Sequence, residues 1–251
     1  MYAWKCWRET RAVFFLFLIL ALAFVGFMDA AGLSKTAQTV RSSEHPGEQA
    51  VAAREFLVPI TLGIVYAIAI SGACLLGAKS AGGELDAGTA EFLFTRPEKR
   101  AVMSWTHWGV CAAEIAGIIF VPVMLQMLVL SGAGIPKMWS LAAATPVFLF
   151  ASLPILGIST LMTAVRRSAN SGLIFALGIV LGYTFLGTVL RRMWNIELPD
   201  FSSPIVGWLT GVAVQHPQDH VVFPWAAALR VLVLAVTLPV AAQFVLKRAE
   251  V

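Results

Sequence analysis

The sequence predicts an all-α, polytopic membrane protein with six transmembrane helices, and two observations support this prediction. Of the 251 residues, 59% are hydrophobic and only 13% are charged, a composition too apolar for an ordinary soluble protein. The apolar residues also gather in six runs, each close to the roughly 20 residues that a helix needs to cross a bilayer. We therefore expect one membrane domain over residues 12–251.

The first apolar run follows a short stretch, residues 1–11, in which Trp4 and Trp7 stand beside Arg8 and Arg11. Aromatic rings among basic side chains suit a helix that lies at the level of the lipid headgroups. We expect an N-terminal amphipathic interfacial helix here. The alternative is that these residues only anchor the start of the first span.

Polar connections separate the six runs. Residues 33–55 should form a surface loop or short helix on the outer side, and residues 191–224 form a second outer segment with an apolar patch too short to span. The expected spans, in chain order, are Ala12 to Gly32, Phe56 to Ala78, Ala101 to Ser131, Trp139 to Val165, Ser171 to Leu190 and Trp225 to Leu246.

Small residues recur at four-residue spacing in two of these spans. Ala69, Ala73 and Gly77 lie in the second, and Gly178 and Gly182 in the fifth. Such residues let helices approach closely in lipid, where hydrophobicity alone does not drive association. They predict helix packing faces, which we expect to be used within the chain.

The basic residues predict the topology. With the N-terminus in the cytoplasm, eleven of the 18 Lys and Arg residues face the cytoplasm and six lie outside. This bias predicts a multi-pass protein of the cell inner membrane with both termini cytoplasmic. Because the basic residues are spread over short loops, the net charge of +4 does not indicate nucleic-acid binding.

A polar segment, residues 79–101, connects the second and third spans. It carries four acidic side chains beside basic ones, so it must lie in water. Residues 84–94 are rich in helix formers and predict a short amphipathic helix. Thr95 and Glu98 fit a capping box, which predicts that the next helix begins at Thr95.

Two ionisable residues, His107 and Glu114, lie in the third span seven residues apart, which places them on one helical face. An ionisable group inside a membrane is costly and is by default a functional candidate. We therefore take both as candidate pathway residues. The alternative for Glu114 is a buried, protonated or hydrogen-bonded structural group.

The segment after the second span resembles a known family. Its pattern, E-x-D-x-G-T-x-E-x-L-x-x-x-P-x-x-R, resembles the first cytoplasmic loop of type-2 ABC exporter permeases, and residues 4–11 resemble the amphipathic start of the same family. His107 stands where such permeases often carry a Lys. The named positions of the E-x-D-x-G-T-x-E-x-L-x-x-x-P-x-x-R pattern are Glu84, Asp86, Gly88, Thr89, Glu91, Leu93, Pro97 and Arg100.

This resemblance implies a permease subunit that pairs with a second copy or a paralogue and carries separate ABC ATPase subunits. The segment would form a cytoplasmic coupling helix that docks into the ATPase, and short re-entrant helices would precede the last span. The implied ATPase-coupling residues are Glu84, Leu85, Asp86, Gly88, Thr89, Glu91, Phe92, Leu93, Arg96 and Pro97.

The chain itself shows no nucleotide-binding motif and no catalytic constellation. His216, Asp219 and His220 could form part of a metal site, but with no further ligand on the outer side we expect a capped turn there and no metal. We expect the chain to be no enzyme and to bind no cofactor, with ATP and Mg held by the partner ATPase. Its cysteines, Cys6, Cys74 and Cys111, should be buried thiols. The sequence thus predicts export of an unidentified substrate. The alternatives are a membrane scaffold or assembly factor that docks an ATPase, or an intramembrane enzyme built on Glu114 and His107.

Overall fold

The computed structural model describes residues 2–42, 46–86, 100–132, 144–195, 205 and 223–248. These residues form six long helices and contain no strand, so the predicted all-α class is confirmed. The helices are α1 (Tyr2–Ser42), α2 (Pro46–Asp86), α4 (Arg100–Gly132), α6 (Ala144–Arg166), α7 (Ala169–Trp194) and α9 (Trp225–Arg248).

Each helix contains a segment that is long and apolar enough to cross a membrane, which confirms the six predicted spans. These segments are Ala3–Gly32, Ile60–Lys79, Val102–Val129, Ala144–Arg166, Ala169–Trp194 and Trp225–Leu246.

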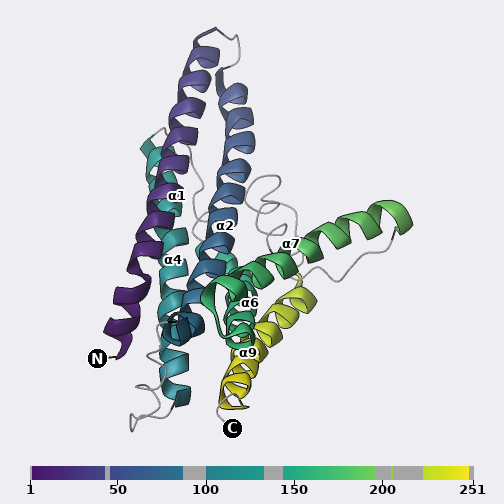
Figure 1. The fold of residues 1–251 in the computed structure, drawn as a ribbon. Helices are drawn as coiled ribbons and strands as arrows, with labels where there is room; N and C mark the ends of the chain where they lie inside the picture. The colour runs from purple at the N-terminus through teal and green to yellow at the C-terminus, as the bar shows by residue number, and fades with distance from the viewer. Residues whose placement is uncertain are drawn as a thin grey trace.

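Successive helices run in alternating directions, so the two ends of the chain lie at the same end of the bundle (Figure 1). We call this the termini end. It contains the start of α1, the end of α2, the start of α4, the α6–α7 turn and the end of α9. The segment with the family resemblance therefore leaves and re-enters the bundle at the termini end, between Asp86 and Arg100.

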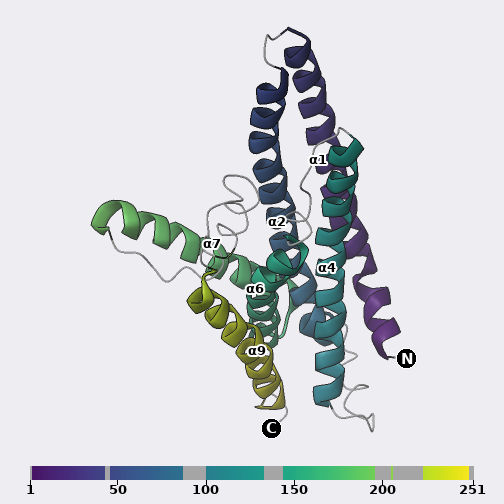
Figure 2. The same cartoon turned by 180° about the vertical axis from the view of Figure 1, so that it is seen from behind.

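Helices α1 and α2 are much longer than a membrane requires. Each has 41 residues, about 60 Å at 1.5 Å per residue, against roughly 30 Å of hydrocarbon. Together they form a hairpin that extends past the other helices at the opposite end (Figures 1 and 2). Of the two forms expected for residues 33–55, the surface loop is wrong for residues 33–42 and 46–55, which are helical and continue α1 and α2 in place of a separate short helix. Polar residues in water do not stop a helix, and Pro46 occupies a first helical position that proline tolerates.

Two shorter predicted helices are absorbed into longer ones. Residues 2–11 are the first turns of α1, with no separate interfacial helix, because no Gly or Pro interrupts the chain before the first span. Likewise, Glu84 to Asp86 are the last residues of α2 and do not begin a new helix. The Gly82-Gly83 pair between them and the span weakens a helix without forbidding it. The rest of the expected coupling helix lies outside the described residues.

The interior of the bundle is centred on α2 and α6. More than half of the most apolar segment of each is buried, compared with 6% for α7. α2 packs against α1, α4, α6 and α7. The largest fully buried apolar side chains include Leu62 and Leu76 from α2, Ile115 and Ile118 from α4, and Phe148 from α6.

The small residues of α2 form the predicted packing face. Ala69 and Ala73 are fully buried. A Cβ added at Gly77 would lie 2.7 Å from the Leu156 carbonyl oxygen and from Ser159 Cβ of α6. At the same contact, the Ser159 hydroxyl donates a hydrogen bond of 2.5 Å to the Cys74 carbonyl. Close backbone approach and a hydrogen bond thus join α2 to α6.

The packing face predicted in the fifth span makes no contact with the described residues. A Cβ added at Gly178 or Gly182 would meet no atom of the described structure within 4 Å. The physical reason is the direction of α7, which leaves the bundle beyond its first turns (Figures 1 and 2).

The α6–α7 turn consists of Arg166, Arg167 and Ser168. Arg167 takes the left-handed conformation, with φ 53°, and the Gly172 N–H donates to the Ser168 carbonyl at 2.9 Å. The Arg166 guanidinium lies 4.6 Å from the centre of the Phe175 ring, a cation–π contact.

Only Ile205 is described from the interior of the expected re-entrant segment. It is buried and belongs to a small apolar cluster with Ala227 and Val231 of α9, against which Val147 and Phe150 of α6 pack. The remaining apolar patch of residues 201–212 lies outside the described residues.

We expect Gly172→Ala to lower the thermal unfolding midpoint of the protein in detergent. The new Cβ would lie 2.5 Å from Thr163 Cα, and overpacking of this kind costs about 1–3 kcal/mol. Gly178→Ala is the matched control, since its Cβ meets nothing. Unfolding is monitored by tryptophan fluorescence. Equal midpoints for the two variants would contradict the close approach of α7 to α6.

Candidate functional site: a polar cluster between α1 and α4

Helices α1 and α4 run parallel and side by side along a contact that we call the α1–α4 seam (Figure 2). Most of the seam is apolar. A Cβ added at Gly117 of α4 would lie 3.0 Å from the Phe14 ring of α1, and Phe17 belongs to the same buried cluster as Ile118. Near the termini end, however, the seam contains several buried polar side chains.

Glu114 is the central residue of this polar cluster. It lies near the middle of the Val102–Val129 span and is only 3% exposed. Its Oε1 atom is in hydrogen-bond contact with the hydroxyl of Thr10, a fully buried residue of α1. Its Oε2 atom is buried and has no hydrogen-bond partner among the described residues. The Thr10–Glu114 contact therefore joins two helices that are far apart in sequence.

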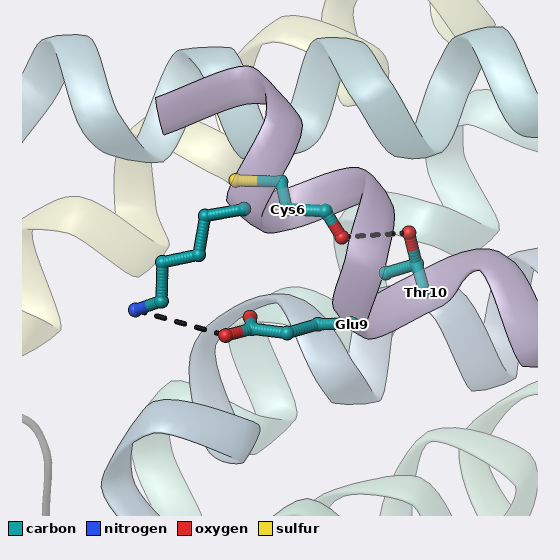
Figure 3. Close-up of polar contacts among 4 residues, drawn as sticks. Cys6, Glu9 and Thr10 are labelled. Atoms are coloured by element: carbon teal, nitrogen blue, oxygen red, sulfur yellow. Dashed lines mark hydrogen bonds and ion pairs between the residues drawn. The ribbon is translucent and has the colours of Figure 1, made fainter. Parts of the chain in front are cut away.

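Thr10 has a second oxygen neighbour. Its hydroxyl lies 3.0 Å from the carbonyl oxygen of Cys6, one turn earlier in α1 (Figure 3). The Trp7 carbonyl oxygen lies farther away, at 3.5 Å. Since a hydroxyl carries one hydrogen, it cannot donate to Glu114 and to a carbonyl of α1 at the same time. Among the charged residues of this part of α1, the Lys5 ammonium pairs with the Glu9 carboxylate at 3.7 Å, and both side chains are partly exposed. The Lys5 charge also acts on His107 of α4.

Cys111 and His107 extend the cluster along α4. The Cys111 thiol is fully buried and lies 3.7 Å from the Leu76 carbonyl of α2. His107 is 2% exposed, and neither of its ring nitrogens has a hydrogen-bond partner among the described residues. Because residues 107, 111 and 114 share one face of a helix, the seam holds an imidazole, a thiol and a carboxyl in a row.

The chemistry available to this cluster is proton exchange and hydrogen bonding. Within the described residues, no group of three or more His, Cys, Asp or Glu side chains could hold a metal ion. All three cysteines are buried free thiols, as predicted. The Thr10 contact matches the hydrogen-bonded alternative for Glu114, and a role of Glu114 and His107 in a substrate pathway stays a prediction.

The other predicted site residues fall into two groups. Of the anchors, Trp4 is 67% exposed and Arg8 and Arg11 are exposed, while Trp7 packs its ring 5.3 Å from that of Phe14. Of the coupling residues, Glu84, Leu85 and Asp86 end α2, whereas Gly88, Thr89, Glu91, Phe92, Leu93, Arg96 and Pro97 lie outside the described residues.

Sequence reasoning missed Thr10, Asp29 and Gln126, which are also buried polar residues of the bundle. The rule that singled out Glu114, an ionisable residue inside a span, applies equally to Asp29 in the first span. Thr10 gives no comparable signal, because it stands among charged residues and its partner is more than a hundred residues away.

Comparison of the chain with protein-family models, with curated proteins and with solved structures gives no match in any of the three.

We expect Thr10→Val to destabilise the protein, because it keeps the shape of the side chain but leaves the buried Glu114 carboxyl without its partner. Such a loss costs about 1–3 kcal/mol. Thr10→Ser retains the hydroxyl and is the control. Thermal unfolding in detergent should separate the two variants, and a Val variant as stable as the Ser variant would contradict the hydrogen bond.

Proposed function

We propose that this chain is the permease subunit of an ABC transporter. It forms part of a membrane pathway for export of an unidentified substrate, and a separate ATPase subunit supplies the energy. A second copy or a paralogue completes the pathway. The proposal rests on the resemblance of residues 84–100 to a coupling segment and on the place where α2 and α4 bring that segment out of the bundle.

The observation that carries the proposal is the continuity and packing of α2. This helix runs without interruption from Pro46 to Asp86, so it extends seven residues, about 10 Å, past its Ile60–Lys79 span at the termini end. It contacts α1, α4, α6 and α7. A push on residues 84–100 would therefore move a stiff element that touches four of the other five described helices.

The proposed mechanism follows from this geometry. An ATPase that closes on ATP would displace the end of α2, and the close Gly77 contact would pass the displacement to α6 without slack. On its other side, α2 contacts α1 and α4, whose seam contains the polar cluster. Movement between these two groups of helices would open the pathway alternately to the two sides of the membrane.

We expect Glu91→Lys and Gly88→Pro to abolish productive coupling without affecting membrane insertion. Tagged protein extracted from native membranes in mild detergent should carry ATPase activity. Either substitution should reduce that activity strongly, because the first reverses a charge and the second places a proline in the expected coupling helix. Glu48→Lys, at the opposite end of α2, is the matched control.

Two results would contradict this account. Equal ATPase activity in the wild type and in both coupling variants would remove the assigned role of residues 84–100. An ATPase that co-purifies with the chain but is never stimulated by candidate substrates in liposomes would indicate a docking scaffold in place of a permease.

The proposed topology has a separate test. We expect a cysteine introduced at Glu91 to react with a membrane-impermeant maleimide only from the cytoplasmic side, and one at Glu48 only from the outer side. The three native thiols are buried, so background labelling should be low. Reaction of the Glu91→Cys variant from outside would place the coupling segment on the wrong side for an ATPase.

A further inference from the structure

We infer that the α1–α4 seam contains a proton-binding site, formed by Glu114 of α4 and Thr10 of α1, and that the seam is closed when a proton is bound and opens when it is lost. This goes beyond the proposed transport function. It concerns a control on the position of α1 that holds whatever the chain transports.

The Thr10 hydroxyl has one hydrogen and three oxygen neighbours. These are Glu114 Oε1, the Cys6 carbonyl at 3.0 Å and, more distant, the Trp7 carbonyl at 3.5 Å (Figure 3 shows the Cys6 contact). If the Glu114 carboxyl carries a proton, it donates to Thr10, and Thr10 donates to Cys6, so both contacts are hydrogen bonds. If Glu114 is ionised, it can only accept, and Thr10 must give up Cys6 to donate to it. One bound proton therefore satisfies both contacts.

The surroundings of Glu114 are unfavourable to its ionised form. An ionised Glu114 would hold a full charge in a seam where it is 3% exposed, with one hydroxyl donor to Oε1 and no described partner for Oε2. Such a charge is costly unless water reaches it. Separation of α1 from α4 lets water reach Glu114, so loss of the proton and opening of the seam are linked.

The groups around Glu114 do not compensate the charge. On α1, Cys6 is a buried thiol, and the Lys5 ammonium pairs with the Glu9 carboxylate while its charge acts on His107 of α4. On α4, Cys111 and His107 are buried. On α2, the Leu76 carbonyl faces Cys111, and Cys74 and Lys79 lie within one turn of it. Lys79 is exposed, so no ammonium or guanidinium group pairs with Glu114 among the described residues.

The native cysteines report the state of the seam. Cys6 and Cys111 lie in the seam and are buried, so N-ethylmaleimide reaches them only when α1 and α4 separate. Cys74 is equally buried, and its carbonyl accepts the α2–α6 hydrogen bond, so it reacts when the bundle unfolds. Peptide mass spectrometry gives the alkylation rate of each thiol in the same sample.

The test measures the ratio of the Cys111 rate to the Cys74 rate from mildly acidic to mildly alkaline buffer. In the wild type we expect this ratio to rise roughly tenfold as the pH increases, the size expected for loss of one buried hydrogen-bonded contact. In Glu114→Gln it should stay flat and low, because the amide donates to Thr10 at every pH. An ionised Glu114 carboxylate repels the Cys111 thiolate, so thiol ionisation alone would raise the ratio less in the wild type than in Glu114→Gln, which is opposite to the expected difference.

Two outcomes overturn the site. A ratio that changes with pH equally in the wild type and in Glu114→Gln would assign the effect to another group, such as His107. If the Gln variant does not fold, Thr10→Val replaces it: a neutral Glu114 then has no acceptor, so Cys6 and Cys111 should react rapidly at all pH values while Cys74 stays protected. A Val variant with wild-type rates would show that Thr10 and Glu114 do not hold the seam.

Discussion

The contact between α2 and α6 is the interaction on which the rest of the bundle depends. In lipid, the hydrophobic effect does not draw helices together, so close backbone approach and interhelical hydrogen bonds must do so. Gly77 permits that approach, since any Cβ would meet the Leu156 carbonyl at 2.7 Å, and Ser159 adds a hydrogen bond to the Cys74 carbonyl. With α6 fixed in this way, α2 still contacts α1, α4 and α7. Its position therefore sets the positions of most of the bundle.

The α1–α4 seam is built differently. Ring packing between Phe14 and Gly117 supports its middle, but near the termini end it depends on a buried carboxyl and a hydroxyl. A contact between small residues depends on their shape and does not change with the pH of the solution. The contact through Glu114 depends on one hydrogen, so it can change with pH. The molecule thus combines a rigid pair, α2 and α6, with a second pair, α1 and α4, whose contact chemistry can change. Helix α2 contacts both helices of the second pair.

The sequence predicted the features that depend on local pattern. Six apolar runs gave six spans, four-residue spacing in the second span gave the packing face at Ala73 and Gly77, and apolar surroundings gave buried cysteines. The predictions that failed concern features that local pattern does not determine. The same small-residue spacing at Gly178 and Gly182 meets no neighbour among the described residues, because α7 diverges from the bundle. The polar residues after the first span continue α1 to Ser42, because polarity does not decide between helix and loop in water.

The sequence by itself determined that this chain crosses a membrane six times, since the length of an apolar run must match the thickness of hydrocarbon whatever the fold. It also marked Glu114 as unusual, since a carboxyl inside a span is costly in any arrangement. Only the tertiary structure decided that Thr10 is its partner, that His107 is enclosed on the same seam, and that the α2 packing face meets α6. Those facts depend on which helices become neighbours, and periodicity along one helix does not specify its neighbour.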